Sequence, residues 1–413
     1  MGAFFVDSNE CQRAKLDAKR IGRYLSLNGW KETNSPRRAD IIYFGTCGFV
    51  TYMEEQGRHM ITRLRREKPQ AKLVVGGCLP KISSTFEKEL RAQGITVLLQ
   101  PEGIEDIVPP RQVKWQEMSG SGEPYVQDSG MRESLIRRLV RYANEFGAGS
   151  GVQHVIRYAL DVAAQPFNPL RRRVCLIEIA RGCVGSCAYC AARFARGRLS
   201  SRPADEIINE ITAHYARGYR RFRLVSSDAG CYGHDQGSSL PQLLRSILAS
   251  RTDTHFQIDA LNTKWLIQYR EELVPIFHRY QDRLSVTISV ESGSSRILSL
   301  MKRGYVREEA LACLTLLRKQ APRLRIAATI LVGFPSETPE DFLQTKSLLV
   351  AGRFDVALVF KYSDRPGTLS SEMVDKVPED IKRKRMRALE ATQLRINRVV
   401  MFNRTRDVAR LSK

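Results

Sequence analysis

Short apolar segments alternate with amphipathic stretches through the first hundred residues of the chain. The apolar segments, which have the length of buried strands, are residues 3–6, 40–46, 72–76 and 96–99. The stretches between them repeat apolar residues at helical spacing over residues 15–27, 53–65 and 84–92. Strands that alternate with helices predict an open parallel α/β sheet in this part of the chain.

A second series of strand-like segments begins near residue 174, and a helical pattern follows each of them. The six segments are residues 174–180, 222–226, 256–261, 284–290, 326–332 and 356–362. Six such units predict a partial (β/α)6 barrel of the TIM type, with its chemistry at the carboxyl ends of the strands. The predicted fold class is therefore α/β, an open parallel sheet domain followed by a partial barrel.

The two predicted sheets divide the chain into four parts, residues 1–118, 119–173, 174–372 and 373–413. Residues 119–124 have the composition of a flexible linker, and residues 131–146 and 152–164 have the patterns of two short helices. This insert has two interpretations, a binding element for a substrate or leader segment and an elaborated clamp between the domains. The last part contains a basic, helix-like run over residues 379–398.

The length and charge of the chain limit the kinds of protein that it can be. With 413 residues the chain is longer than most domains that have a single hydrophobic core, which agrees with two domains. Its 66 basic and 44 acidic residues give a net charge of +22, which favours a polyanionic or acidic partner. The basic clusters at residues 63–68, 171–173, 220–223 and 382–385 are either phosphate-binding or solvated helix faces. Because no apolar run reaches the roughly 18 residues that span a bilayer and no signal peptide is recognisable, we expect a cytoplasmic protein without membrane contact.

Three cysteines stand close together directly after the first predicted barrel strand. Cys183, Cys187 and Cys190 have C-x3-C-x2-C spacing. Three thiolates at this spacing can ligate three irons of a [4Fe-4S] cluster and leave the fourth iron open to chelate a small molecule. A zinc knuckle is the alternative, but it needs a fourth ligand, and the nearest candidates complete no familiar spacing: Cys175, His214 and Cys231.

Three further cysteines follow strands of the first predicted sheet. Cys11 follows the first strand across a short loop, and Cys47 and Cys78 close the second and third strands. Since ligands of open parallel sheets bind at the carboxyl ends of the strands, these thiols would meet at one edge and could hold a second cluster. The alternative is that each cysteine is a small buried apolar residue.

Both cysteine sets lie in segments that resemble the radical S-adenosylmethionine (SAM) methylthiotransferases. In the N-terminal part the similar segments are Cys11-Gln12, residues 39–49 (ADIIYFGTCGF) and residues 74–80 (VVGGCLP). In the barrel they are the cysteine triplet and residues 196–203, 227–235, 291–294, 301–305, 333–338, 360–368 and 377–378. The resemblance covers about residues 1–115 and 174–400.

This resemblance implies SAM and two [4Fe-4S] clusters as cofactors. Cys183, Cys187 and Cys190 would carry reductive cleavage of SAM, and Cys11, Cys47 and Cys78 would carry sulfur delivery. In the implied mechanism a radical made from SAM removes hydrogen from an unactivated C–H bond, and CH3–S is delivered to that carbon. The implied cofactor contacts are Tyr189, Ser227, Asp228, Glu291, Ser292, Gly333 and Phe334.

Three of the singled-out residues have a structural interpretation as well. Asp228 is either a contact to SAM or substrate or an ordinary helix cap. Gly293 and Gly333 stand at strand ends, where a glycine either lets the backbone approach a ligand or serves a plain turn.

The substrate is less well determined by the sequence. Members of the family that it resembles act on an adenosine of tRNA or on an aspartate of a ribosomal protein. No segment after residue 398 resembles the family's small β-rich TRAM domain. Together with the insert, this favours a polypeptide, such as a ribosomally made peptide, whereas the basic charge favours tRNA.

We therefore expect a methylthiotransferase that modifies a polypeptide, with C2 of a tRNA adenosine as the alternative. A one-electron reductant such as a flavodoxin or ferredoxin is a further expected partner. A non-catalytic iron–sulfur or zinc protein that binds RNA is a remote third hypothesis.

Overall fold

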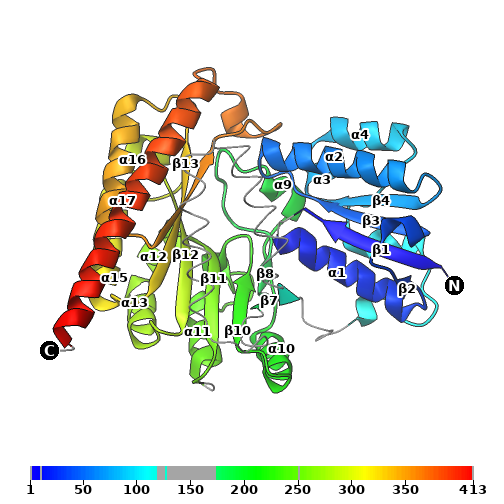
Figure 1. Cartoon of the computed structure of the whole chain (residues 1–413), viewed down its shortest axis with the longest axis horizontal. Coiled ribbons are helices and arrows are strands. Elements are labelled where there is room, and N and C mark those ends of the chain that lie inside the picture. The colour runs from blue at the N-terminus through cyan, green and yellow to red at the C-terminus, as the bar shows by residue number, and fades with distance from the viewer. Residues whose placement is uncertain (1, 10–11, 119–125, 128–173, 250–251, 412–413) are drawn as a thin grey trace.

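The protein is described by a computed structural model of residues 2–9, 12–118, 126–127, 174–249 and 252–411. Two sheets of parallel strands lie side by side, one near each end of the molecule (Figure 1). The N-terminal sheet and its helices are blue in Figure 1, and the second sheet runs from green to orange.

The N-terminal sheet has five strands in the order β2-β1-β3-β4-β5. These strands are β1 (Ala3–Ser8), β2 (Lys31–Glu32), β3 (Ile41–Thr46), β4 (Lys72–Gly77) and β5 (Thr96–Val97). The helices between and after them are α1 (Gln12–Leu27), α2 (Thr51–Glu67), α3 (Leu79–Ile82), α4 (Ser84–Ala92) and α5 (Ile104–Ile107). The short edge strand β2 has only exposed residues, which explains why apolar periodicity does not predict it.

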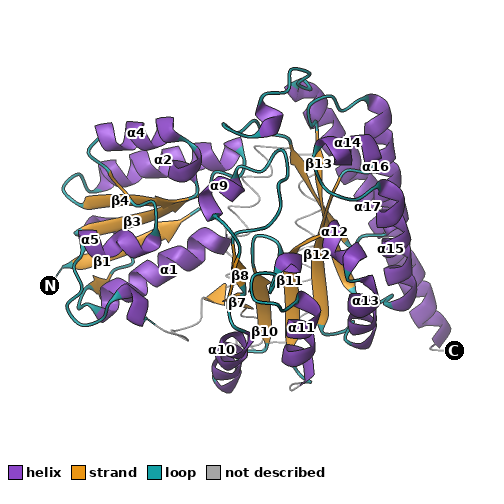
Figure 2. Ribbon diagram, turned by 180° about the vertical axis from the view of Figure 1, so that it is seen from behind, coloured by secondary structure: helices purple, strands orange, loops and turns teal. Residues whose placement is uncertain are grey.

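Helices cover both faces of this sheet (Figure 2). On one face Ile42 and Phe44 of β3 pack with Ile61 of α2, in the same cluster as Phe86 and Leu90 of α4. On the other face, the alternate residues of β3 and β4 pack against α1 and α5, in a cluster that includes Ile41, Tyr43, Val74, Ile21 and Ile104. Because successive side chains of a strand point to opposite faces, a strand buried on both faces is apolar along nearly its whole length, as β3 is.

The second sheet has seven strands in the order β14-β13-β12-β11-β10-β7-β6. They are β6 (Val126–Gln127), β7 (Val174–Glu178), β10 (Arg221–Val225), β11 (His255–Asn262), β12 (Leu284–Glu291), β13 (Arg325–Val332) and β14 (Val356–Lys361). Neighbouring strands from β7 to β14 are parallel, whereas β6 pairs antiparallel with β7. A separate pair of short strands, β8 (Ala180–Arg181) and β9 (Ser200–Ser201), brackets the cysteine triplet.

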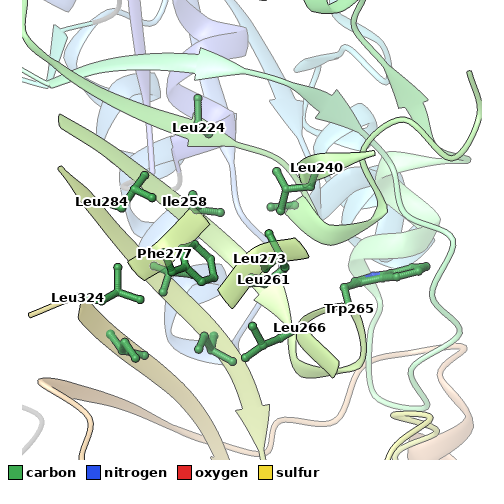
Figure 3. Close-up of a cluster of buried hydrophobic side chains, with 14 of the residues drawn as sticks. Leu224, Leu240, Ile258, Leu261, Trp265, Leu266, Leu273, Phe277, Leu284 and Leu324 are labelled. Carbon is green, nitrogen blue, oxygen red and sulfur yellow. The ribbon is translucent and has the colours of Figure 1, made fainter. Parts of the chain in front are cut away.

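The helices of this part lie mostly on the outer face of the sheet, whereas the first of them lies between this sheet and the N-terminal one (Figure 2). They are α9 (Ala192–Arg196), α10 (Ala204–Ala216), α11 (Leu240–Ala249), α12 (Thr263–Gln268), α13 (Arg270–Arg279), α14 (Ser295–Leu300), α15 (Arg307–Gln320), α16 (Pro339–Gly352) and α17 (Glu379–Leu411). Leucine, isoleucine and phenylalanine side chains from strands and helices form one large core, part of which is drawn in Figure 3. The predicted α/β class and the partial barrel of six parallel strands are confirmed.

Ion pairs and hydrogen bonds join the N-terminal part of the protein to the barrel. The buried Glu178, at the end of β7, lies 3.0 Å from Arg13 and 2.7 Å from Arg20, both of α1. On the other side, Arg365 lies 2.7 Å from Glu54 of α2. These contacts between charged groups hold the N-terminal part against the mouth of the barrel.

Two further observations concern the expected elements. The predicted helices at residues 131–146 and 152–164 lie outside the described residues, so both interpretations of the insert stay open. Among the described residues, no helix combines the length and apolar character that crossing a membrane requires.

Candidate functional site

Two of the three N-terminal cysteines lie at one edge of the first sheet. Thr46 of β3 is the register partner of Gly77 of β4, and the Cys78 N–H donates to the Thr46 carbonyl at 2.9 Å. Cys47 and Cys78 therefore follow paired residues on adjacent strands. The approach is so close that a Cβ on Gly77, whose φ is +93°, would lie 2.2 Å from the Thr46 carbonyl oxygen. Glycine is required here for both its conformation and its size.

The chain leaves β1 beside the same edge. Ser8 pairs with Gly45, and the Asn9 N–H donates to the Gly45 carbonyl at 2.9 Å. Cys11 comes two residues later but lies outside the described residues. Its place beside Cys47 and Cys78 stays a prediction, which the path of β1 favours.

The cysteine triplet lies in the loop between β8 and α9. Cys183, Cys187 and Cys190 are all partly exposed. The Gly185 N–H donates to the Cys183 sulfur at 3.1 Å, and a Cβ on Gly185 would lie 3.2 Å from the Cys183 sulfur and 3.9 Å from the Cys187 sulfur. Because glycine leaves this space beside two thiols empty, the loop fits an iron–sulfur cluster better than a packed apolar turn.

The two cysteine sets adjoin each other. Cys78 packs against a buried cluster formed by Ile82, Ala191 and Ala195, and Ala191 is the residue after Cys190. In addition, the Lys81 ammonium donates to the Ala195 carbonyl at 3.2 Å. Figure 2 shows α9 between the N-terminal sheet and the barrel strands. Groups held by the two cysteine sets would therefore face one region of the protein.

A buried arginine, Arg303, reaches the triplet from the segment after α14. One terminal nitrogen lies 3.3 Å from both the Cys187 sulfur and the Tyr189 hydroxyl. The other donates to the Asn262 side chain at 2.9 Å and to the Ser289 carbonyl at 2.7 Å. Arg303 was not among the predicted contacts, although it lies in the segment 301–305 that carries part of the resemblance.

Two predicted cofactor contacts, Glu291 and Tyr189, lie beside this arginine, and a third, Ser227, follows the end of β10. The Glu291 carboxylate lies 3.9 Å from the Arg303 guanidinium, and burial raises the pKa of Glu291. Burial likewise raises the pKa of Tyr189. The Ser227 hydroxyl is buried and has no hydrogen-bond partner among the described residues. Unused buried polar atoms are rare in proteins, so this hydroxyl fits a site that a polar ligand fills.

Asp228, by contrast, is occupied within the fold. It caps the short helical turn Ala229–Cys231, and its carboxylate accepts hydrogen bonds from the backbone of Gly230 and Asn262 and from the Trp265 indole at 2.8 Å. The helix-cap interpretation of Asp228 is therefore the one that the contacts support.

Ser292 and Gly293 have a packing role beside α16. Ser292 is fully buried, and its hydroxyl lies 3.2 Å from that of Thr345. A Cβ on Gly293 would lie 2.4 Å from the Gln344 carbonyl oxygen. Close packing of the strand end against the helix thus explains this glycine without a ligand.

Gly333 and Phe334 are likewise engaged in the fold. Gly333 has a φ of +74°, and its N–H donates to the Glu337 carboxylate at 2.7 Å. Phe334 is fully buried and packs edge-on against Tyr189, with ring centroids 6.5 Å apart. Phe334 supports the tyrosine beside the third cysteine rather than presenting an exposed surface to a ligand.

Cys231 lies unexpectedly close to the triplet. The sulfurs of Cys183 and Cys231 and a carboxylate oxygen of Asp228 all lie within 4.8 Å of one another. However, Cys231 is fully buried, its thiol donates to the Asp228 carbonyl at 3.0 Å, and the Asp228 carboxylate already accepts from three N–H groups. A hydrogen bond with Cys231 lowers the pKa of Cys183, which favours its thiolate. These contacts fit a supporting role for Cys231 better than a zinc site.

Comparison with known proteins identifies both parts of the chain. Residues 3–98 match the uncharacterized protein family UPF0004, and residues 177–349 match the radical SAM superfamily. A tRNA-2-methylthio-N(6)-dimethylallyladenosine synthase of Syntrophobacter fumaroxidans is 30% identical over 397 residues, which are 94% of this chain and 80% of that protein. The chain belongs to the radical SAM methylthiotransferase family. It is an enzyme that uses SAM and carries two [4Fe-4S] clusters, so the non-catalytic hypothesis is wrong.

Other relatives agree with this assignment. The enzyme of the same name from Thermotoga petrophila is 29% identical over 401 residues, 96% of this chain and 82% of the relative. A "Probable threonylcarbamoyladenosine tRNA methylthiotransferase" of Archaeoglobus fulgidus is 28% identical over 390 residues, 93% of this chain and 81% of the relative. These names agree with tRNA, the alternative substrate of the sequence analysis, and give no support to the polypeptide that it favoured.

A solved structure of lower identity shares the fold. The radical SAM methyltransferase TsrM from Kitasatospora setae, solved with tryptophan and a SAM analogue, superposes with a TM-score of 0.58 at 14% identity. The match covers 90% of this chain and 75% of TsrM. At this identity the likeness concerns the arrangement of the strands and helices alone.

Replacement of Arg303 by lysine should slow SAM cleavage. Lysine keeps the positive charge but loses the planar fork that contacts Cys187, Tyr189 and Asn262 together. We expect about a tenfold lower rate of 5′-deoxyadenosine formation with unchanged iron content, the effect of one lost charged hydrogen bond. Arg307→Lys, whose guanidinium lies near Ser347 instead, is the matched control. Equal rates for Arg303→Lys and the unaltered enzyme would remove Arg303 from the site.

Proposed function

We propose that this enzyme methylthiolates C2 of an adenosine in tRNA. The observation that carries the proposal is the similarity to proteins named as tRNA methylthiotransferases, which spans 93% to 96% of this chain in three relatives. The net charge of +22 supports a polyanionic substrate.

The division of labour between the cysteines is part of the proposal. Cys183, Cys187 and Cys190 would hold the cluster that binds SAM, and Cys11, Cys47 and Cys78 the second cluster. When bound, the clusters and SAM supply the radical and sulfur chemistry, and the protein holds them in place. The packing of Cys78 against the cluster that contains Ala191, the residue after Cys190, supports this arrangement because it brings the two sets together.

Around the proposed clusters, the chain's own side chains position the groups. Arg303 donates toward Cys187 and Tyr189 from a buried position, and Asn262 holds its other terminal nitrogen. Tyr189, Ser227 and Glu291 are the predicted SAM contacts that remain, with polar atoms near the strand ends. Asp228, Ser292, Gly333 and Phe334 would support these contacts through their packing and hydrogen bonds within the fold.

Two exposed aromatic rings next to the cysteine sets suit an RNA base. Phe49, two residues after Cys47, is 50% exposed and packs edge-on against Phe360. Phe194 of α9 is 44% exposed, and the Arg193 guanidinium lies 4.8 Å from its ring centroid. Unpaired bases of RNA stack on aromatic rings and arginine planes, so these side chains offer a surface for an extruded adenosine.

The proposal places the enzyme in the cytoplasm, where tRNA is modified. It also requires a one-electron reductant, such as a flavodoxin or ferredoxin. The domain limits that we propose are residues 1–118 for the N-terminal domain and 174–372 for the barrel, with residues 119–173 and 373–413 as the insert and the C-terminal helical segment.

The substrate is tested by incubation of anaerobically reconstituted enzyme with SAM, reductant, sulfide and either bulk tRNA or a peptide library. We expect a methylthioadenosine nucleoside in digests of tRNA by mass spectrometry. Binding of tRNA should weaken steeply with salt, since each neutralised phosphate adds about one unit to the log–log slope.

Phe194→Ala should reduce tRNA methylthiolation by about tenfold, since stacking of one base contributes about 1–3 kcal/mol. Leu343→Ala removes a similarly exposed apolar side chain from α16 and should have no effect. Methylthiolated peptide in the absence of any modified tRNA would refute the proposed substrate.

A further inference from the structure

A small cavity lies where the N-terminal sheet meets the loop around α9. Its volume is about 90 Å3. It is lined by Cys78 and by residues from both parts of the protein, among them Arg13, Lys81, Arg181 and Arg196. The cavity thus lies at the domain interface and borders Cys78, one of the proposed ligands of the second cluster.

The groups around this cavity carry an excess of positive charge. Among the described residues, four cationic side chains line it, Arg13, Lys81, Arg181 and Arg196, whereas Asp17 is the acid among the lining residues. Arg181 lies 3.5 Å from Asp17.

A second acid, Glu178, lies behind the lining and does not remove the excess. It is shared by Arg13, Arg20 and Arg181, at 3.0, 2.7 and 3.1 Å. Among the described residues, the four lining cations thus exceed the nearby carboxylates, which are Asp17, Glu178 and, beside Lys81, Glu102. Since charge in a poorly hydrated space requires compensation, the cavity favours an anion.

Lys81 is the cation best placed to hold it. Its ammonium donates to two neutral acceptors, the Gln100 side chain at 3.0 Å and the Ala195 carbonyl at 3.2 Å. Among the described residues no carboxylate lies within ion-pair distance of it. Since an ammonium has three N–H donors, one donor remains for a ligand in the cavity. The Tyr43 ring also borders this space.

Under the proposed function, the enzyme must take up a small sulfur donor. Each transfer of CH3–S removes one sulfur atom from the enzyme, so sustained turnover needs a sulfur atom from solution. Hydrosulfide is the simplest such donor, is anionic near neutral pH and is small enough for a cavity with room for a few water molecules.

We propose that this interdomain cavity binds hydrosulfide and passes it to the Cys78 side of the second cluster. The inference rests on the proposed function, in which Cys78 is a ligand of that cluster. The anion crosses the cavity unchanged, and no bond forms or breaks there. Lys81 is accordingly a binding residue for the sulfur source and takes no part in SAM cleavage.

The kinetic test compares Lys81→Met with Lys88→Met, an exposed lysine of α4 that does not line the cavity. With sodium sulfide as the sulfur source, we expect the KM for sulfide of Lys81→Met to rise about tenfold, as for loss of one charged hydrogen bond. The first turnover, which uses sulfur already on the enzyme, and 5′-deoxyadenosine formation should stay unchanged. An unchanged KM for sulfide would overturn the inference and leave the proposed function intact.

A second measurement needs no variant and no activity. Crystals of the reconstituted enzyme soaked in sodium bromide should show an anomalous bromide peak between Lys81 and Arg196. The peak should be absent from Lys81→Met and present in Lys88→Met. A cavity without bromide in the unaltered enzyme would contradict the anion site. If bromide binds but no tRNA is methylthiolated at any sulfide concentration, the proposed function fails instead.

One arm of the kinetic test separates free sulfide from a protein-bound persulfide. A cysteine desulfurase and cysteine replace sodium sulfide in the assay. If the enzyme turns over with the desulfurase but never with free sulfide, the cavity is not the entry of the sulfur source.

Discussion

The variant in which Cys183, Cys187 and Cys190 are all replaced by alanine should form no 5′-deoxyadenosine. The expected reason is that the three thiols next to Gly185 are the only anchors of the proposed SAM cluster in this loop, and SAM binds to its open iron. Reconstituted unaltered enzyme should contain about eight irons per chain and the variant about four. Iron analysis and chromatography of the reaction products measure both effects.

The control for this variant is Cys313→Ala. Cys313 is a buried thiol of α15 in the barrel core, outside both cysteine sets, and its loss should leave iron content and SAM cleavage intact at a modest cost in stability. SAM cleavage by the triple variant at an undiminished rate would show that the open iron is bound elsewhere.

Replacement of Cys11, Cys47 and Cys78 by alanine should have the complementary effect. SAM cleavage should persist, because the triplet, Arg303 and Glu291 are unaltered. The methylthiolated nucleoside should fall below detection, because the second cluster, which is proposed to deliver the sulfur, is lost. The variant should again contain about four irons per chain.

This second variant also tests Cys11, which lies outside the described residues. Cys11→Ala alone should abolish the methylthio product as completely as the triple variant does. Cys175→Ala, a buried thiol of β7, is the matched single control and should retain the product. Normal product formation without Cys11, Cys47 and Cys78 would contradict the proposed role of the second cluster in sulfur delivery.

Local sequence patterns predicted the elements that carry the site. The strands at residues 40–46 and 72–76 are predictable because β3 and most of β4 are buried on both faces, which makes their sequences largely apolar. The cysteine triplet was recognisable because three ligands of one cluster must be close in the chain when a single loop holds them. The second set was recognisable because parallel strands end at a common edge.

The same patterns could not assign the role of individual polar residues. Asp228 and Ser292 stand in segments that resemble the family, yet their oxygens are engaged by Trp265 and Thr345, which are 37 and 53 residues away along the chain. Gly293 carries no side chain because the Gln344 backbone lies against it. Such contacts depend on how a strand end packs against a helix that is distant in the sequence. The spacing of apolar residues along the chain does not reveal this packing.

For this protein the sequence by itself determined the two parallel folds, the two cysteine sets and the reaction class, because strand burial and ligand spacing are local properties. Only the tertiary structure decided that Cys78 packs against the cluster that contains Ala191, that Arg303 reaches Cys187 across 116 residues, and that four cations of the described residues line a small cavity at the domain interface. These features join residues that are far apart in the chain, within the barrel or across the domain interface, and their distances exist only once the chain has folded.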